Sequence, residues 1–258
     1  MSAILFDLDG VLYQGDTVIG GAAKAVAWFV NNNIPHLFLT NTTSKPRSAL
    51  VEKLSGFGIT TTSEQFLTPP LAAVQLLKSQ QRHRLALFIP KVTHDEFSAF
   101  EIIESGDEPV DAVIIGDLAE GWDFSKLNGA FRLLMNNPDA ILLALGMTRY
   151  WRAHDGLQLD VGPFVKALEY ASGRTPVVTG KPAPGFYQAA VELLGVDSAV
   201  YMIGDDIVGD IEAAQQVGLH GLLVRTGKFR ESDLDSAITP DAIINSVADL
   251  PDWWSKHT

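Results

Sequence analysis

The sequence contains no cysteine among its 258 residues. A chain without cysteine has neither a disulfide framework nor a metal site built from thiolates. Basic residues are also few: 19 Lys and Arg stand against 31 Asp and Glu, which gives a formal net charge of −12. Because nucleic-acid phosphates and anionic membrane surfaces are bound by clustered Lys and Arg, we expect neither as a partner.

Long hydrophobic runs are missing as well. The longest, 140–145, is far shorter than the ~20 residues that a membrane-spanning helix needs. The N-terminal residues reach Asp7 after a short apolar run, a pattern unlike that of a targeting segment. These observations predict a soluble protein of the cytoplasm.

The chain does contain a regular alternation of short apolar runs with helix-length amphipathic segments. Such alternation predicts an α/β fold with a mostly parallel sheet and helices on both of its faces. The expected strands are 3–6, 36–39, 85–89, 110–115, 141–144, 200–203 and 221–224. The expected helices are 22–32, the segment after Ser44, 95–103, 125–135, 163–171, 184–194, 207–217 and the tail from 246.

Two carboxylates follow the first expected strand directly. Asp7 and Asp9 are separated by one residue, so that in an extended chain both side chains point the same way. Ligands of open α/β sheets bind at the carboxyl ends of the strands, which is where this pair lies. On its own the pair also fits an ordinary strand-to-turn junction, because Asp and Gly are common in turns.

A second acidic cluster follows the strand expected at 200–203. Asp205 and Asp206 lie at the end of this strand, and Asp210 lies about one helical turn later. Carboxylates gathered at neighbouring strand ends repel one another unless a cation lies between them, and Mg²⁺ prefers such oxygen ligands. For Asp206 an alternative is a simple helix N-terminus, where acidic residues are favoured.

Two further segments carry groups suited to a phosphate. Thr40 and Asn41 end a strand just before a helix begins, so their side chains and nearby backbone N–H groups form a candidate phosphate cradle. A plain capping loop is the alternative. Lys181 is held between Gly180 and Pro182, and it would supply the cation that a phosphate dianion needs. A solvated surface charge is the alternative for this lysine.

Taken together and in order, these motifs resemble those of the haloacid dehalogenase superfamily of phosphatases. The motifs are Asp7-Leu8-Asp9-Gly10, Thr40-Asn41, Gly180-Lys181-Pro182 and Gly204-Asp205-Asp206 with Asp210. The segment 224–230 is particularly similar to the phospholysine phosphohistidine inorganic pyrophosphate phosphatase subfamily. The resemblance implies a Rossmann-like catalytic core formed by residues 1–79 and 177–258, with an α/β cap domain inserted at 80–176.

The resemblance also implies roles for individual residues. Asp7 would attack phosphorus and form an aspartyl-phosphate, and Asp9 would protonate the leaving group and later activate water. Thr40, Asn41 and Lys181 would bind the phosphate, and Lys181 would also offset the charge of Asp7.

The implied cofactor is Mg²⁺. Its ligands would be the Asp7 carboxylate, the main-chain carbonyl of Asp9 and the Asp205 carboxylate. Asp210 or Asp206 would support the ion from the inner or outer coordination shell, and the sequence leaves open which of them does so.

The expected activity is hydrolysis of a small phosphorylated metabolite, with phosphoramidates and pyrophosphate among the candidates. Arg149, Tyr150 and Trp151 in the cap would contribute to specificity, unless they are surface residues that pack the cap on the core. A phosphomutase on the same fold and a catalytically silent ligand-binding relative are the alternatives. The oligomeric state stays open between a monomer and a homodimer.

Overall fold

The computed structural model describes residues 2–104, 108–153 and 156–258, and these residues form two compact units. The first unit consists of Met1–Thr40, Arg47–Leu67 and Lys181–Thr258. The second consists of Asn41–Pro46 and Thr68–Gly180. The second unit is therefore almost one continuous stretch of chain, whereas the first is assembled from three segments.

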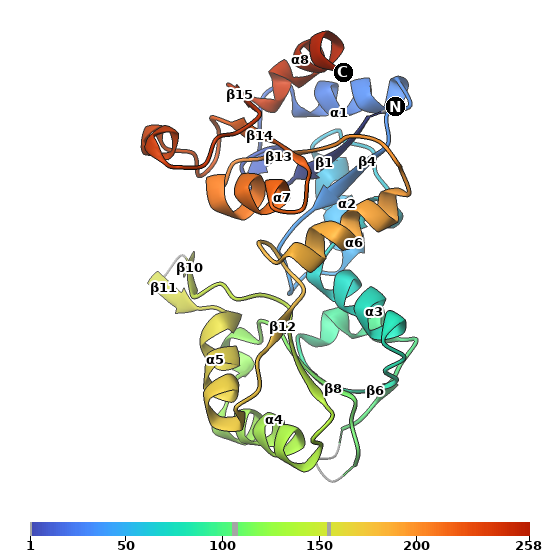
Figure 1. The fold of residues 1–258 in the computed structure, drawn as a ribbon, viewed down its shortest axis with the longest axis vertical. Coiled ribbons are helices and arrows are strands. Elements are labelled where there is room, and N and C mark those ends of the chain that lie inside the picture. Colours follow the sequence, from blue (N-terminus) through green and yellow to red (C-terminus); the bar gives the residue numbers. More distant parts are fainter. Residues whose placement is uncertain (1, 105–107, 154–155) are drawn as a thin grey trace. The chain divides into compact units, whose positions relative to one another are not determined.

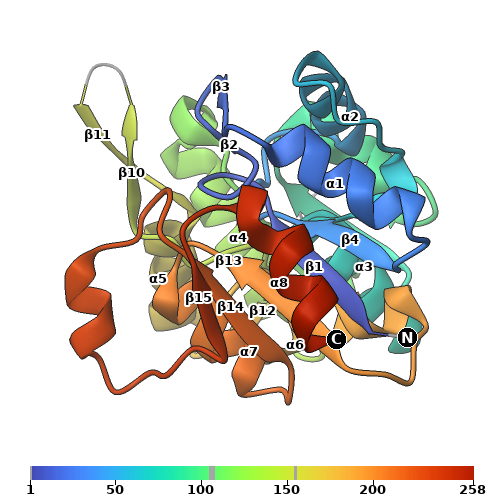
Figure 2. The ribbon, with the colours of Figure 1, turned by 90° about the horizontal axis from the view of Figure 1, so that it is seen from above.

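The first unit is built on a parallel sheet of six strands in the order β15-β14-β13-β1-β4-β5 (Figure 2). The strands are β1 (Ala3–Asp7), β4 (His36–Leu39), β5 (Phe66–Leu67), β13 (Val200–Gly204), β14 (His220–Val224) and β15 (Ala242–Ile244). Every residue of β1 is buried, as expected for an apolar strand in the middle of a parallel sheet. In its register Phe6 lies opposite Ile203, and Asp7 lies opposite Leu39.

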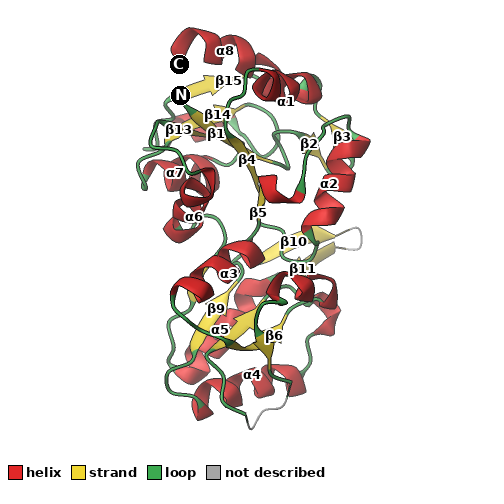
Figure 3. Cartoon of the chain, turned by 90° about the vertical axis from the view of Figure 1, so that its right-hand side faces the viewer, coloured by secondary structure: helices red, strands yellow, loops and turns green. Residues whose placement is uncertain are grey.

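Helices cover both faces of this sheet (Figure 3). Helices α1 (Ala22–Asn31), α2 (Arg47–Gly56) and α8 (Leu250–His257) pack on one face. Helices α6 (Pro184–Leu194) and α7 (Ala213–Gln215) lie on the other. The first face has an aromatic core, in which the ring of Phe6 meets Phe29 edge-on at 5.4 Å and stacks on Phe38 at 5.7 Å. This core fixes β1, and hence the strand end at which Asp7 lies.

The second unit has its own parallel sheet of five strands in the order β12-β9-β8-β6-β7. The strands are β6 (Arg84–Phe88), β7 (Glu101–Ile102), β8 (Ala112–Ile115), β9 (Ile141–Ala144) and β12 (Val177–Val178). Helices α4 (Phe124–Asn136) and α5 (Val161–Ser172) cover one face, and α3 (Pro69–Ser79) covers the other (Figure 1). Among the described residues, no helix is long and apolar enough to cross a membrane.

Each unit also carries an antiparallel hairpin outside its main sheet. In the first unit β2 (Tyr13–Gln14) pairs with β3 (Thr17–Val18). In the second, β10 (Tyr150–Ala153) pairs with β11 (Gly156–Leu159). Neither hairpin was predicted from the sequence, because both are too short to show a clear alternation of polar and apolar residues.

The prediction of an α/β fold is confirmed, since both main sheets are parallel and have helices on both faces. The helix expected at 95–103 is wrong. A short 3₁₀ helix, Lys91–Phe97, is followed there by strand β7. The backbone N–H of Glu101 donates to the carbonyl of His83, and that of Ile103 donates to Leu85, so strand pairing with β6 replaces the last helical turns.

Helix α3 belongs to the second unit, whereas the sequence analysis placed the start of the insertion at residue 80. The buried side chains of α3, Ala73, Val74 and Leu77, pack against the second sheet together with Leu85 and Ile114. Apart from Asn41–Pro46, the second unit therefore begins at Thr68, one helix before the boundary that the resemblance implies.

Candidate active site

Asp7 and Asp205 lie at the carboxyl ends of the two central strands of the first sheet. Asp7 is the last residue of β1, and Asp205 directly follows β13. Because β1 and β13 are paired in parallel, both chains deliver their carboxylates to the same edge of the sheet. Asp210 lies in a π-helical turn, Ile207–Glu212, that follows β13. π-Helical turns of this kind are frequent at functional sites.

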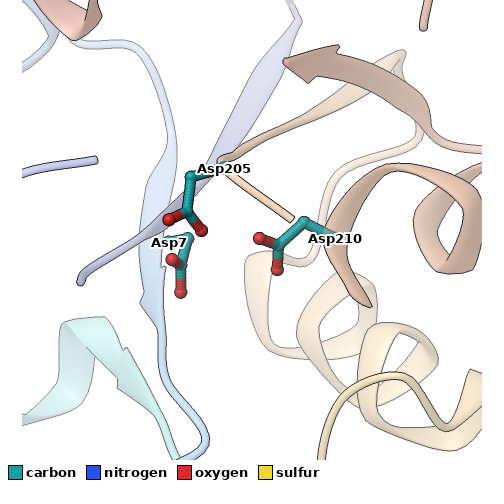
Figure 4. A group of neighbouring side chains, drawn as sticks. All are labelled: Asp7, Asp205 and Asp210. Atoms are coloured by element: carbon teal, nitrogen blue, oxygen red, sulfur yellow. The ribbon is translucent and has the colours of Figure 1, made fainter. Parts of the chain in front are cut away.

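The carboxylates of Asp7, Asp205 and Asp210 form a buried group, which we call the carboxylate cluster. One oxygen from each residue lies within 4.8 Å of those of the other two. The three side chains point toward one another (Figure 4). Their exposed fractions are only 7%, 1% and 1%. Three acidic groups withdrawn from water at this distance require a compensating positive charge.

Lys181 supplies part of that charge. Its Nζ lies 2.5 Å from Oδ1 of Asp7 and 2.7 Å from Oδ1 of Asp210. Burial acts to lower the pKa of Lys181, but the charges of Asp210 and Asp7 outweigh it, so that its pKa lies well above the ordinary value. Lys181 therefore stays protonated, and it bridges two of the three carboxylates.

One lysine does not neutralise three carboxylates. Burial is the main reason that the pKa of Asp7 is raised from 3.8 to about 7, although Lys181 acts in the opposite direction. Burial also raises the pKa of Asp205 to about 6. In both residues the surroundings disfavour the charged form, and a divalent cation would reverse this effect.

Asp205 provides the test of whether a cation fits. Its Oδ2 accepts a hydrogen bond of 2.6 Å from the backbone N–H of Lys228. Its Oδ1 is buried and has no hydrogen-bond partner among the described residues. A buried carboxylate oxygen without a partner is costly, and here it belongs to a residue of the carboxylate cluster. The donor set contains only oxygen atoms, which is what Mg²⁺ prefers, so the residues fit this ion.

Asp206 makes different hydrogen bonds from its neighbour Asp205. Its Oδ1 accepts hydrogen bonds from the backbone N–H groups of Val208 at 3.2 Å and Gly209 at 2.8 Å. Its Oδ2 lies 3.3 Å from Nζ of Lys228. Burial acts to raise the pKa of Asp206, but the Gly209 N–H and Lys228 lower it below the ordinary value. Asp206 thus caps the π-helical turn, whereas Asp210 belongs to the carboxylate cluster.

Asp9 lies on the loop after β1, and its side chain is exposed, in contrast to that of Asp7. The loop turns back at once: the N–H of Gly10 donates to the carbonyl of Tyr13 at 2.6 Å. The carboxylate of Asp9 is therefore within reach of solvent water.

Of the three residues predicted to bind phosphate, Thr40 and Lys181 belong to the first unit and Asn41 to the second. Thr40 directly follows β4 in the first unit, and its N–H donates to the carbonyl of Leu67 at 3.3 Å. It therefore lies at the same edge of the sheet as Asp7, because Asp7 pairs with Leu39. Asn41 begins the loop that belongs to the second unit.

The three residues predicted to set specificity lie in the second unit, at the start of the β10–β11 hairpin. Tyr150 and Trp151 are 52% and 42% exposed. The guanidinium of Arg149 lies 5.8 Å from the centre of the Tyr150 ring. Tyr150 also pairs across the hairpin with Leu159, which is itself exposed. These side chains are thus available for contact with a ligand.

Tyr187 is a residue of this site that the sequence analysis missed. It is fully buried on α6, and its hydroxyl donates to the carbonyl of Gly209 at 2.5 Å. It therefore holds the π-helical turn that carries Asp210. Burial, with the charge of Asp210, raises its pKa well above the ordinary value, so the hydroxyl keeps its proton. In the sequence it is one of several aromatic residues on an amphipathic helix, and nothing distinguishes it from a core residue.

We expect Tyr187→Phe to lower the free energy of unfolding by about 1 kcal/mol, because the Gly209 carbonyl loses a buried donor. Urea unfolding at neutral pH measures the change. Tyr170→Phe is a suitable control, since Tyr170 is 93% exposed and its loss of a hydroxyl should leave stability unchanged. Equal stability of Tyr187→Phe and the wild type would show that this hydrogen bond does not support the turn.

Comparison with known protein families links both ends of the chain to one family. Residues 4–102 match the family model described as haloacid dehalogenase-like hydrolase, and residues 178–250 match a second model for hydrolases of this type. Among curated proteins, the phospholysine phosphohistidine inorganic pyrophosphate phosphatase of Homo sapiens is 38% identical over 98% of this chain and 94% of its own length.

Solved structures with the same fold include a hypothetical protein from Pyrococcus horikoshii. It has a TM-score of 0.91 and 26% identity, and the match covers 98% of this chain and 100% of that one. A glycerol phosphate phosphatase from Mycobacterium tuberculosis, solved in complex with magnesium, has a TM-score of 0.85 and 28% identity. That match covers 96% of this chain and 75% of the other.

Proposed function

Because the chain belongs to the haloacid dehalogenase-like hydrolases, we propose that it is a Mg²⁺-dependent phosphatase of a small phosphorylated molecule, with an aspartyl-phosphate intermediate. The observation that carries the proposal is the carboxylate cluster with Lys181 between Asp7 and Asp210. We further propose that the first unit is the catalytic core and that the second is its cap.

In the first step, Oδ2 of Asp7 attacks phosphorus. A bond forms between this oxygen and phosphorus, the bond from phosphorus to the leaving group breaks, and Asp9 gives a proton to the departing atom. Lys181 keeps Oδ1 of Asp7 occupied, so that the carboxylate presents its other oxygen. The step is possible because Lys181 offsets negative charge that would otherwise repel the phosphate.

In the second step, water attacks the phosphorus of the aspartyl-phosphate and gives a proton to Asp9. The bond between Asp7 and phosphorus breaks, which releases inorganic phosphate and restores both carboxyl groups. Thr40 and Asn41 are proposed to hold phosphate oxygens, Thr40 from the same sheet edge as Asp7. Asp9 suits its role because its side chain remains accessible to water.

The cation would be held by Asp7 and Asp205, together with the main-chain carbonyl of Asp9, with Asp210 in support. When bound, Mg²⁺ would neutralise charge that develops on the phosphoryl oxygens. Within the described part of the chain, Oδ1 of Asp205 accepts no hydrogen bond, whereas Asp206 is occupied at the π-helical turn.

The substrate class follows from the relatives. The human relative is named for phospholysine, phosphohistidine and inorganic pyrophosphate, and we propose that phosphoramidates or pyrophosphate are among the substrates of this chain. Arg149, Tyr150 and Trp151 are proposed to contribute to the choice, since they offer a cation and two exposed rings. A small phosphorylated metabolite is therefore the proposed partner.

A substrate panel tests the proposed function. Phosphate release is measured from p-nitrophenyl phosphate, sugar phosphates, nucleotides, pyridoxal phosphate, pyrophosphate and phosphohistidine, with and without Mg²⁺. We expect release from at least one of these, its loss in EDTA and its recovery with Mg²⁺. Release that requires a bisphosphorylated activator would instead favour a phosphomutase. Ligand binding without any release would favour a catalytically silent relative.

We expect Asp205→Asn to abolish the stabilisation that Mg²⁺ confers, and to stabilise the metal-free protein at pH 8. The folded pKa of Asp205 is about 6, above its ordinary 3.8. The stability that protonated Asp205 contributes is thus fully present below pH 3.8 and is lost as the pH rises through about 6. At pH 8 the variant should therefore gain about 1 to 3 kcal/mol over the metal-free wild type. The gain should be smaller at pH 5.

Thermal unfolding with and without Mg²⁺ at pH 8 and pH 5 measures both effects. Asp206→Asn is the matched control. Its side chain caps the π-helical turn, and an Asn oxygen can accept the same N–H bonds, so the variant should keep the response to Mg²⁺ and lose only the ion pair with Lys228. An equal rise in melting temperature on adding Mg²⁺ to the Asp205→Asn variant and to the wild type would contradict the proposed ligand.

A further inference from the structure

The loop after β14 contacts the site from a part of the chain that the proposed chemistry does not use. Its turn, Thr226-Gly227-Lys228, donates hydrogen bonds to Asp205 and to Gly10. The backbone N–H of Lys228 donates to Oδ2 of Asp205 at 2.6 Å, and the hydroxyl of Thr226 donates to the carbonyl of Gly10 at 2.5 Å. We call these three residues the 226–228 turn.

Close packing fixes the 226–228 turn against the site. A Cβ on Gly227 would lie 2.0 Å from Oδ2 of Asp205 and 2.5 Å from Cα of Gly10. A Cβ on Gly10 would in turn lie 1.9 Å from the same Oδ2. Both glycines have positive φ, 69° for Gly227 and 91° for Gly10. The carboxylate of Asp205 is thus enclosed between two backbones that approach closely only because both residues lack a side chain.

This arrangement determines which oxygen of Asp205 is left without a hydrogen bond from the described residues. Oδ2 is occupied by the N–H of Lys228, and Oδ1 is left without a partner among the described residues. A carboxylate held in this way offers a single oxygen to a cation. Without the Lys228 N–H, the side chain could rotate and offer either oxygen or both.

The second hydrogen bond acts on the backbone next to Asp9. The N–H of Gly10 already donates to the carbonyl of Tyr13, and Thr226 holds the carbonyl of the same glycine. The peptide groups on both sides of Gly10 are therefore fixed. The carbonyl of Asp9 belongs to the peptide that Tyr13 holds, and the 226–228 turn holds the next peptide, so the turn restrains that carbonyl only through Gly10.

We propose that the 226–228 turn is a positioning element for the divalent cation, in which Thr226 and Gly227 are positioning residues. The inference rests on the proposed function, because it assumes that the carboxylate cluster binds a cation. Hydrogen bonds that orient metal ligands commonly contribute a factor of about 10 to 100 in metal affinity. Loss of these contacts should therefore weaken cation binding first, and should alter substrate binding little.

Mn²⁺ binding to the full-length protein tests the proposal without any catalytic assay. The protein is freed of divalent ions, and bound Mn²⁺ is measured by electron paramagnetic resonance for the wild type and for Thr226→Val, Thr226→Ser and Gly227→Ala. We expect an affinity loss of about 10-fold or more in Thr226→Val and Gly227→Ala. Thr226→Ser keeps the hydroxyl and should retain wild-type affinity.

Gly218→Ala is the control for backbone strain. Gly218 has a φ of 84°, close to that of Gly227, but a Cβ there would meet no atom of the described residues within 4 Å. The Gly218→Ala variant thus tests the effect of the strained conformation without the contact to Asp205, and it should bind Mn²⁺ like the wild type. Circular dichroism shows whether Gly227→Ala folds. If it does not, the proposal is tested by the Mn²⁺ affinity of Thr226→Val relative to that of Thr226→Ser.

A second measurement separates positioning from general damage. At saturating Mg²⁺ the Thr226→Val variant should regain most of its kcat with an unchanged KM for substrate, which a damaged core would not do. Wild-type Mn²⁺ affinity in both Thr226→Val and the folded Gly227→Ala would overturn this inference alone. Absence of Mn²⁺ binding by the wild type would overturn the metal site itself, and this inference with it.

Discussion

Asp7→Asn is expected to lower kcat by about 10⁴-fold or more, because the variant lacks the oxygen nucleophile on which the proposed reaction depends. The fold should persist. Burial raises the pKa of Asp7 to about 7 in the absence of a cation, so its surroundings accept a neutral side chain. Stopped assays of phosphate release, with circular dichroism on the same samples, measure the two properties together.

The matched control for this substitution is Asp16→Asn. Asp16 lies in the turn of the β2–β3 hairpin, its side chain is fully exposed, and its ion pair is with Lys53 at 3.3 Å. The Asp16→Asn variant should have wild-type activity, since Asp16 does not belong to the carboxylate cluster. Activity of Asp7→Asn close to that of the wild type would refute the assignment of the nucleophile.

Lys181→Met is expected to reduce both activity and stability. Removal of the ammonium leaves Asp7 and Asp210 buried without their shared cation, and the loss of one partner from a buried pair costs about 3 to 5 kcal/mol. The activity should fall by about 10²- to 10³-fold, because a donor directed at the charged centre is lost. These are the largest effects that we expect from a residue that is not itself the nucleophile.

The stability deficit of Lys181→Met should depend on pH. The pKa of Asp7 is already raised to about 7, and removal of Lys181, which acts to lower it, raises it further. A carboxyl whose folded pKa is raised stabilises the protein at low pH and ceases to do so as the pH rises through that pKa. The deficit relative to wild type should therefore be larger at pH 8 than at pH 5.5.

Urea unfolding at the two pH values, without divalent ions, measures this difference. Lys126→Met serves as the control, because Lys126 and its ion-pair partner Asp123 are both exposed. Its stability should change by less than about 1 kcal/mol at either pH. A deficit of Lys181→Met that is the same at both pH values would show that unpaired carboxylates are not its cause.

The strands that build the site were predictable from sequence, because they are buried on both faces and appear as continuous apolar runs. The runs at 3–6 and 200–203 end just before Asp7 and Asp205, and parallel pairing of β1 with β13 brings these strand ends together. The pairing itself is not visible in the sequence. Lys181 is 174 positions from Asp7, and only the order of the family motifs connected the two.

Which of Asp206 and Asp210 belongs to the carboxylate cluster could not be predicted from their spacing in the sequence. Both lie near a helix N-terminus, where acidic residues are common. The structure separates them because Asp206 precedes the π-helical turn and accepts hydrogen bonds from its first N–H groups. Asp210 lies inside that turn and faces Lys181. In a π-helical turn the side chains point in other directions than in an α-helix. No sequence pattern in 207–217 predicts such a turn.

Contacts made by the main chain were likewise beyond sequence reasoning. The donor to Asp205 is the backbone N–H of Lys228, which any residue except proline could provide. The helix wrongly expected at 95–103 has a related cause. Its apolar positions suited an amphipathic helix, but the backbone of Glu101 and Ile103 is engaged by the neighbouring strand. Tertiary pairing thus outweighed local preference.

The division of the first unit into three chain segments has a consequence for biosynthesis. β1 finds its neighbour β4 within the first 40 residues, but its other neighbour, β13, begins only at Val200. The second unit ends at Gly180 and is therefore complete when half of the first sheet has yet to leave the ribosome. Until β13 is available, the edge of β1 that pairs with β13 has no partner strand. The centre that carries Asp7, Lys181, Asp205 and Asp210 is thus among the last parts of the protein to assemble.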